Sequence, residues 1–474
     1  MDILNNKFHK IFGDKIVSKK LSQLQEFSRL PRFVSEYLLM RYSDGETISQ
    51  ENLKQISNFI RKYYPELREK HKILNDLMEK GEYKLLDFFS LETDIVNETH
   101  YVHIPSLNIR KECRIIPDLI DKYENLLRGG MWGVGTITYN KRGEYDPRPL
   151  LLTEFIPFQV SNFDFDEYIE KRSEFSFDEW LILLMNSIGL NPAKYNRRQT
   201  IILLTRLIPL VESNVNMIEL GPKGTGKTFL FRHTSYYAQI ISGGTVSPAQ
   251  LFFNLNTKSL GLLGLKECVV FDEVSKISFF HTDEIVGKLK DYMESGNFDR
   301  GGKQMKSDAS IVLLGNLPTK EVDGSFRPIS DYLFEVLPPF MKDTALLDRL
   351  NGFIPGWELS RISQTQLHLS KGYGLISDYF CEVLHESRKL DFRSLIRRNV
   401  SFGENVDIRD EKSIEKIASG LLKLLSPNSH IELDTGILEI AMNIAVEYRQ
   451  RIIDQLHSMD PEYKKKTLTY EIIS

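Results

Sequence analysis

The clearest chemical pattern in this sequence is a glycine-rich run between an apolar segment and a helical one. Met217–Leu220 predicts a short buried strand, Gly221–Thr228 has the form GxxxxGKT, and Phe229–Tyr237 predicts a helix. Glycines at this spacing let backbone N–H groups surround a phosphate, and the helix N-terminus adds partial positive charge. The run therefore predicts a phosphate-binding loop made of Gly221, Pro222, Lys223, Gly224, Thr225, Gly226, Lys227 and Thr228.

A pair of carboxylates farther along the chain would turn phosphate binding into hydrolysis. Cys268–Phe271 predicts an apolar strand that ends in Asp272 and Glu273. Lys227 would contact the β- and γ-phosphates, and Thr228 would offer its hydroxyl to Mg²⁺. Asp272 would hold Mg²⁺ through water, and Glu273 would polarise the attacking water. The alternative is an acidic pair that caps a helix. ATP and Mg²⁺ are the expected cofactors.

A third β-rich run, Ser310–Asn316, ends in an amide. In ATPases of the AAA+ class, the strand that follows the Asp-Glu strand carries a polar residue, sensor 1, which positions the attacking water. Asn316 fits that role, although asparagine also commonly ends a strand at a turn. The expected fold class is an α/β AAA+ P-loop core with a helical lid.

Two arginines are candidates for stabilising the charge that builds on the γ-phosphate. Ring ATPases use an arginine from a neighbouring subunit, and Arg349 in Asp343–Leu350 is the candidate here, with a surface salt bridge as the alternative. A second arginine usually comes from the lid. Arg409 lies in the first turn of a predicted lid helix, and Arg361 and Arg300 are rivals for this sensor 2 role.

The first 165 residues have different patterns of apolar residues and turn formers. Helical spacing of apolar residues dominates 1–80, whereas short β-rich runs separated by turn formers occupy 81–165 and suggest a small OB-like barrel. OB folds bind strands through charge and stacking, although aromatic residues in a small barrel more often form its core. The residues considered for DNA contact are Arg110, Lys111, Arg114, Arg128, Lys141, Arg142, Arg148, Tyr101, Trp132 and Tyr139.

The segment before the ATPase region is predicted to be a linker followed by a capped helix. Phe163–Lys171 is acidic and polar, which favours a linker. Ser176 and Glu179 then form the capping-box pattern of a helix start. The resulting domains are 1–80 (helical), 81–165 (OB-like), 176–365 (AAA+ core) and 366–474 (helical lid).

Bulk composition excludes several classes of protein. The chain has 474 residues, of which 41% are hydrophobic and 27% are charged, so it can form the hydrophobic cores of a globular protein. Its net charge of −4 restricts any nucleic-acid contact to a local patch. The three cysteines are too far apart in sequence to suggest a zinc site or a disulfide framework. Because no signal peptide or membrane-length apolar run is present, a cytoplasmic location is expected.

Several longer strings resemble the BrxL family, Lon-like AAA+ proteins of bacterial BREX anti-phage systems. They are Glu219–Thr228, Ile241–Thr245, Leu251–Asn254, Gly261–Leu265, Val270–Val274, Lys290–Phe298, Ile354–Glu358, Val34–Leu39, Gly129–Trp132 and Ala418–Leu425. The resemblance implies an N-terminal DNA-binding region, a core related to the MCM helicases, and homo-oligomeric rings around duplex DNA. Hexamers, heptamers or double rings would fit, as would a role in phage defence beside other defence proteins.

One departure from the family concerns the C-terminus. BrxL proteins usually continue into a Lon-type protease-like domain, whereas this sequence ends at Ser474. We therefore expect no peptidase activity.

The resemblance also singles out Gly296–Lys306. MCM-like motors carry a hairpin here that points into the ring channel, and Gly301-Gly302 suits a hairpin tip. Arg300, Lys303 and Lys306 would then face a phosphate backbone, although three basic residues on an exposed loop are also ordinary. Two competing functions stay open: a protein unfoldase that pairs with a separate peptidase, and an ATP-gated DNA-binding scaffold.

Overall fold

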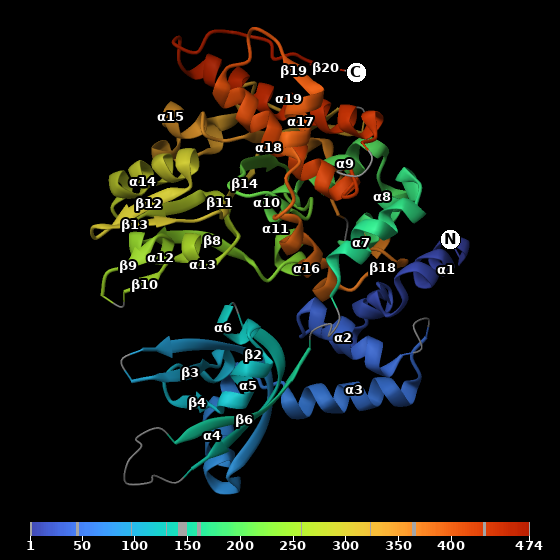
Figure 1. Cartoon of the computed structure of the whole chain (residues 1–474), viewed down its shortest axis with the longest axis vertical. Coiled ribbons are helices and arrows are strands. Elements are labelled where there is room, and N and C mark those ends of the chain that lie inside the picture. Colours follow the sequence, from blue (N-terminus) through green and yellow to red (C-terminus); the bar gives the residue numbers. More distant parts are fainter. Residues whose placement is uncertain are drawn as a thin grey trace. The chain divides into compact units, whose positions relative to one another are not determined.

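The structure is a computed structural model of the chain (Figure 1). It describes residues 2–43, 47–95, 97–128, 130–140, 149–158, 163–256, 258–322, 324–362, 366–429 and 433–473. These residues form two compact units, one of Met1–Lys19 with Asp164–Ser474 and one of Lys20–Phe163. The division differs from the four predicted domains because β1 (Ile16–Ser18) pairs antiparallel with β18 (Tyr373–Leu375). Local sequence patterns do not predict a pairing between strands so far apart in the chain.

A five-stranded sheet forms the centre of the larger unit, in the order β17-β7-β14-β11-β8. Neighbouring strands are parallel throughout, and β7 and β14 are almost wholly buried, as expected when helices cover both faces of a sheet. Parallel strands place their carboxyl ends at one edge, where open α/β sheets bind ligands. The strands are β7 (Asn216–Gly221), β8 (Ala238–Val246), β11 (Cys268–Phe279), β14 (Ser310–Asn316) and β17 (Gly352–Pro355).

Helices surround this sheet, and one of them begins at its predicted cap. Ser176 and Glu179 form the predicted capping box at the start of α8, and Asp407 with Asp410 forms another at the start of α18. The helices are α1 (Asp2–Phe12), α8 (Phe177–Ser187), α9 (Arg197–Thr205), α10 (Ile208–Val211), α11 (Lys227–Thr234), α14 (Thr282–Ser295), α15 (Thr344–Leu347), α16 (Ser377–Ser387), α17 (Arg393–Asn399), α18 (Ile408–Leu425) and α19 (Thr435–Met459).

The predicted linker at Phe163–Lys171 is wrong, because most of it forms α7 (Phe165–Lys171). Asp164 caps this helix by accepting a hydrogen bond from the Glu167 N–H at 3.1 Å. Tyr168 and Ile169 are buried on one face of the helix. Its acidic residues are solvated or ion-paired on the other side. The segment is therefore a short amphipathic helix, and its many charged residues made it resemble a linker.

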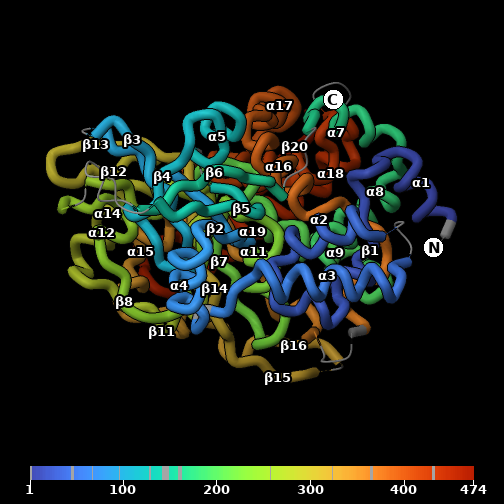
Figure 2. Tube along the Cα trace, turned by 90° about the horizontal axis from the view of Figure 1, so that it is seen from below, coloured from blue at the N-terminus to red at the C-terminus, as the bar shows by residue number. Residues whose placement is uncertain are grey.

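Short antiparallel pairs extend the larger unit. They are β9 (Phe253–Asn254) with β10 (Ser259–Leu260), β12 (Asn297–Arg300) with β13 (Lys303–Lys306), β15 (Thr319–Val322) with β16 (Ser325–Pro328), and β19 (Val400–Phe402) with β20 (Tyr470–Ile472). The short helices α12 (Pro248–Leu251) and α13 (Leu262–Leu265) flank the β9–β10 pair. Figure 1 shows β9–β10 beside β12–β13, and Figure 2 shows β15–β16 at an edge of its unit.

The smaller unit combines helices with a closed five-stranded barrel in the order β2-β3-β4-β6-β5. Its strands are β2 (Glu82–Asp94), β3 (Thr99–His103), β4 (Cys113–Ile115), β5 (Met131–Tyr139) and β6 (Leu150–Pro157). Its helices are α2 (Arg32–Tyr42), α3 (Gln50–Tyr63), α4 (Lys70–Lys80), α5 (Pro117–Lys122) and α6 (Asn125–Arg128). Side chains of α4, such as Ile73 and Leu77, join the barrel's core.

Membrane-length helices and cysteine clusters are two further features of the chain. Within the described parts of the chain, no helix has the length and apolar character needed to cross a membrane. Cys113, Cys268 and Cys381 are free and buried, and no group of three or more potential metal-binding side chains occurs among the described residues.

Candidate active site

The predicted phosphate-binding loop connects the end of β7 to α11. Gly224 and Gly226 have φ values of +84° and +74°, the left-handed region that favours glycine. A Cβ atom on Gly226 would also lie 2.7 Å from Cδ1 of Ile362. The segment that follows β17 crosses the loop at this point, because its Ile362 N–H donates to the Gly224 carbonyl at 2.7 Å. The backbone conformation therefore favours glycine at Gly226, and a Cβ atom there would also have to displace the end of the Ile362 side chain.

Lys227 occupies the first turn of α11 and is buried. Its ammonium group donates to the carbonyl oxygens of Gly221 and Pro222 at 3.2 and 2.8 Å. Burial lowers the pKa of Lys227, and the nearby Glu219 carboxylate opposes that shift. The Lys227 ammonium group is thus held at the loop by two neutral carbonyl acceptors. A phosphate oxygen could take their place and accept a stronger, charge-assisted hydrogen bond.

Thr228 on α11 and Asp272 on β11 come together at the end of the loop. The Thr228 hydroxyl donates to Oδ2 of Asp272 at 2.8 Å. Hydroxyl and carboxylate oxygens are hard ligands that suit Mg²⁺, which usually binds through one or two protein groups, waters and substrate phosphates. The two side chains therefore fit the predicted metal-binding role without a larger cluster of protein ligands.

Glu273 has an unusual backbone conformation. Its φ of +49° lies in the left-handed region, which is uncommon for residues other than glycine and often marks functional sites. The register of β11 against β8 shifts between Asp272 and Ile277, the stretch that contains this residue. The strand was predicted to end at Asp272 and Glu273, but β11 continues to Phe279, so this stretch is an irregularity within a longer strand. The Glu273 carboxylate accepts from the Lys276 ammonium group at 2.9 Å, and its side chain is 41% exposed. The irregular middle of β11 thus presents the carboxylate to solvent.

One cavity of about 380 Å³ unites most of the predicted residues. Asn316 joins it because β14 lies between β7 and β11, with Asn316 paired in register to Gly221. Three segments of the sequence, at the ends of β7 and β14 and in the middle of β11, therefore meet in one place. The lining residues are Lys223, Gly224, Thr225, Gly226, Lys227, Thr228, Phe229, Asp272, Glu273 and Asn316.

The two arginine candidates lie together, and neither belongs to the lining of this cavity. Arg349 and Arg409 both pair with the carboxylate of Glu294, at 3.5 and 2.9 Å. Arg409 also pairs with Asp348. Glu294 on α14 thus brings the loop arginine and the α18 arginine into a single cluster outside the lining of the cavity.

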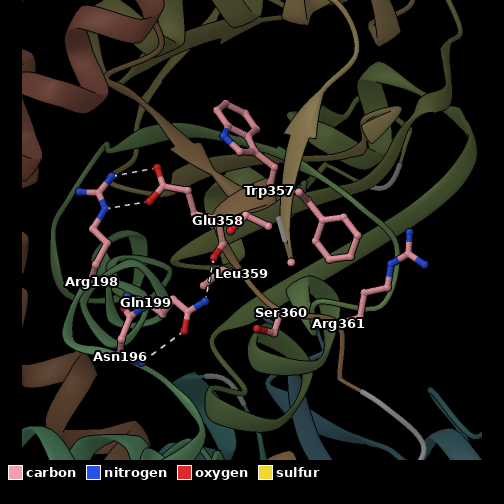
Figure 3. A pocket seen from close by; sticks show the side chains of 11 residues that line it. Asn196, Arg198, Gln199, Trp357, Glu358, Leu359, Ser360 and Arg361 are labelled. Atoms are coloured by element: carbon pink, nitrogen blue, oxygen red, sulfur yellow. Dashed lines mark hydrogen bonds and ion pairs between the residues drawn. The ribbon is translucent and has the colours of Figure 1, made fainter. Parts of the chain in front are cut away.

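The rival arginines have other partners. Arg361 lies over the Phe326 ring at 4.9 Å, and both line a second cavity of about 370 Å³. Figure 3 shows Arg198 in this cavity, with its guanidinium bound to the Glu358 carboxylate at 2.9 and 3.1 Å. Gln199 also donates to the Glu358 backbone carbonyl at 3.0 Å, so the polar groups on this side of the cavity already have protein partners.

The predicted hairpin is present as β12–β13, with Arg300 opposite Lys303. Gly301 and Gly302 form its two-residue tip with φ of +62° and +73°, as a type I′ turn requires. Lys303 and Lys306 are exposed. Arg300 differs from the expectation, because it donates to the Phe253 carbonyl and pairs with Glu284 at 3.4 Å. Its side chain is only 15% exposed, so it anchors the hairpin to its neighbours.

In the smaller unit, the structure separates core residues from surface residues. Tyr101 is fully buried, and Trp132 packs against Phe33 and Phe88. Arg110 and Lys111 are exposed, whereas Tyr139 and Arg114 are half-buried. Lys141, Arg142 and Arg148 lie outside the described residues, and the structure does not describe the side chain of Arg128. Tyr101 therefore belongs to the barrel interior and is not available for stacking.

Sequence reasoning missed a buried ion pair behind the loop. Arg206 donates to both carboxylate oxygens of Glu219 at 2.9 and 2.7 Å, and its remaining terminal nitrogen donates to the Thr225 carbonyl at 3.0 Å. A charged residue in an otherwise apolar strand was the available signal, since buried glutamates are rare without a partner. The identity of that partner depended on the fold.

Family models and known proteins match most of this chain. Residues 150–469 match the family model for the ATPase domain of Lon-like protease BrxL-like proteins, and residues 10–139 match the model for the N-terminal part of the BREX system Lon protease-like protein BrxL. The Lon-like protease BrxL of Escherichia coli O9:H4 (strain HS) is 33% identical over 94% of this chain and 64% of its own length. That of Bacillus cereus (strain H3081.97) is 32% identical over 96% and 67%. The chain thus spans about two thirds of each relative.

Proposed function

Because this chain belongs to the BrxL family, we propose that it is a ring-forming AAA+ ATPase that encircles DNA and acts in anti-phage defence. The observation that carries the proposal is the single cavity into which Lys227, Asp272 and Glu273 converge. These side chains supply, in order, a phosphate contact, a metal ligand and a water-polarising base.

The proposed substrate is ATP with Mg²⁺. Thr228 and Asp272 would hold the metal ion, which would neutralise developing charge on the phosphates. Backbone N–H groups of the loop and the start of α11 would bind the phosphate oxygens. Asn316 would orient the attacking water beside Glu273, since it enters the cavity from the strand between the two motifs.

The AAA+ assignment is supported by the parallel sheet with the loop on β7 and by α18 and α19, which we propose as the helical lid. The closed barrel of β2 to β6 supports an OB-like assignment for the smaller unit. Exposed Arg110 and Lys111 would be its DNA contacts.

Ring formation is supported by the position of Arg349 and Arg409. Both arginines lie outside the cavity of their own chain and share one carboxylate. An arginine cluster of this kind could serve a nucleotide bound to the next subunit, as arginine fingers supplied in trans do. We therefore propose that each ATP is bound by one subunit and completed by its neighbour.

Contact with DNA would come from the tip of β12–β13. Changing Lys303 and Lys306 together to glutamate should abolish the stimulation of ATP hydrolysis by duplex DNA and leave basal hydrolysis unchanged, because both lysines are exposed and away from the cavity. In the unchanged protein, the stimulated rate should fall steeply with salt, since phosphate contacts release counterions. Hydrolysis rates measured with and without DNA at several salt concentrations would test both statements.

The matched control reverses two lysines elsewhere. Lys464 and Lys465 are exposed on the C-terminal segment, so changing both to glutamate alters net charge equally without touching the hairpin. Full stimulation in the hairpin variant, or its loss in the control, would contradict the proposed DNA contact.

One observation favours an unfoldase as the second candidate. Leu255 and Leu260 of the neighbouring β9–β10 hairpin are 51% and 40% exposed, and unfoldases use apolar loops to grip polypeptides. In that case an unfolded protein, and not DNA, should stimulate hydrolysis in the same assay, and changing Leu255 to serine should remove the effect.

A further inference from the structure

A buried ion pair lies directly behind the phosphate-binding loop. Glu219 is in β7, two residues before Gly221, and Arg206 lies between α9 and α10. Their side chains are 0% and 1% exposed. Both oxygens of the carboxylate accept from the guanidinium, at 2.9 and 2.7 Å. This bidentate geometry fixes the plane of the guanidinium as well as its position.

The space for this pair is provided by a glycine. A Cβ atom on Gly356, in the segment after β17, would lie 2.8 Å from Oε1 of Glu219. The strand before the loop and the segment that crosses it are therefore packed around the carboxylate. Since β7 is wholly buried, Glu219 is a rigid anchor for Arg206.

The remaining terminal nitrogen of Arg206 holds the loop itself. It donates to the Thr225 carbonyl at 3.0 Å, between two glycines that both have left-handed conformations. A trans peptide is planar, so the Thr225 carbonyl and the Gly226 N–H point in opposite directions. With the carbonyl held on the buried side by Arg206, the Gly226 N–H points away from it, towards the cavity that Gly226 lines.

We infer that Arg206 and Glu219 are positioning residues that keep the Gly226 N–H aimed at the phosphates of the nucleotide. The inference rests on the proposed function, since it assigns a role within the same ATP site. Glycine-rich loops have many accessible conformations, and ordering such a loop upon binding lowers affinity. The ion pair thus acts by arranging the loop before the nucleotide arrives.

Two variants that leave no buried charge unpaired test the inference. Changing Arg206 and Glu219 together to methionine removes both charges, because loss of one partner alone would leave a buried, unpaired charge. Changing Arg206 to lysine keeps the charge but not the bidentate fork that also reaches Thr225. In both variants the Kd and KM for MgATP should rise about tenfold or more, as expected for a lost hydrogen bond from a charged donor. The kcat at saturation should stay within about twofold, because the groups that act on the water are unchanged.

A matched control removes another buried ion pair. Lys423 and Glu212 are 0% and 3% exposed and 2.9 Å apart, and neither lines the cavity. Changing both to methionine should leave the KM for ATP unchanged. A wild-type Kd in the Arg206 and Glu219 variants, or an equal rise in the control, would overturn the positioning role. Failure of the unchanged protein to bind MgATP would instead overturn the proposed function on which that role depends.

Discussion

Replacing Glu273 with glutamine should lower the rate of ATP hydrolysis by about 10²- to 10⁴-fold, the usual contribution of a general base. The amide has the same shape as the carboxylate but cannot take a proton from the attacking water. Binding of ATP should persist, because Lys227, Thr228 and Asp272 are unchanged and hold the phosphates and metal ion. The measurements are kcat for hydrolysis and the Kd for ATP from a direct titration.

The control for this change is another glutamate. Glu321 on β15 is exposed and lies outside the cavity lining, so its replacement by glutamine should have no effect. Near-normal hydrolysis in the Glu273 variant would remove this residue from the mechanism. The same variant also addresses the scaffold alternative: if DNA loading and phage defence both survive without turnover, ATP binding alone sustains the function.

Replacing Arg349 with alanine should reduce hydrolysis by about 10³-fold or more, the scale expected for loss of an arginine finger. The expectation depends on assembly, because Arg349 is absent from the cavity lining of its own chain. ATP affinity should change little, since the arginine acts on charge that develops during transfer. Arg409 should behave similarly because Glu294 holds both side chains.

Mixed assemblies separate a shared site from a site within one chain. Subunits with Arg349→Ala keep Glu273, and subunits with Glu273→Gln keep Arg349. If the site is shared, mixing the two inactive variants should restore part of the activity, because some neighbouring pairs then contain both residues. Mixtures that remain as inactive as their components would contradict the shared site. The unmixed Glu273 variant, at the same total concentration, gives the baseline activity.

Short-range patterns predicted much of the ATP site. A strand, a GxxxxGKT run and a helix are contiguous, and each is determined by residues a few positions apart, so β7, the loop and α11 appear where expected. The capping box at Ser176 and the two-glycine tip of β12–β13 are equally local. The roles of Glu273 and Arg349 stay predictions that the experiments above address, and the role of Asn316 also stays a prediction.

By itself, the sequence determined where the glycine-rich loop, the helix caps and the hairpin turn lie, because these features follow from the conformational preferences of neighbouring residues. Only the tertiary structure decided which distant residues meet. It paired Arg206 with Glu219 behind the loop, joined Arg349 to Arg409 through Glu294, anchored Arg300 at Phe253 and buried Tyr101 in the barrel. Contacts of this kind depend on how whole helices and strands pack. Because hydrophobic packing is non-directional, the spacing of residues along the chain does not predict which distant residues come into contact.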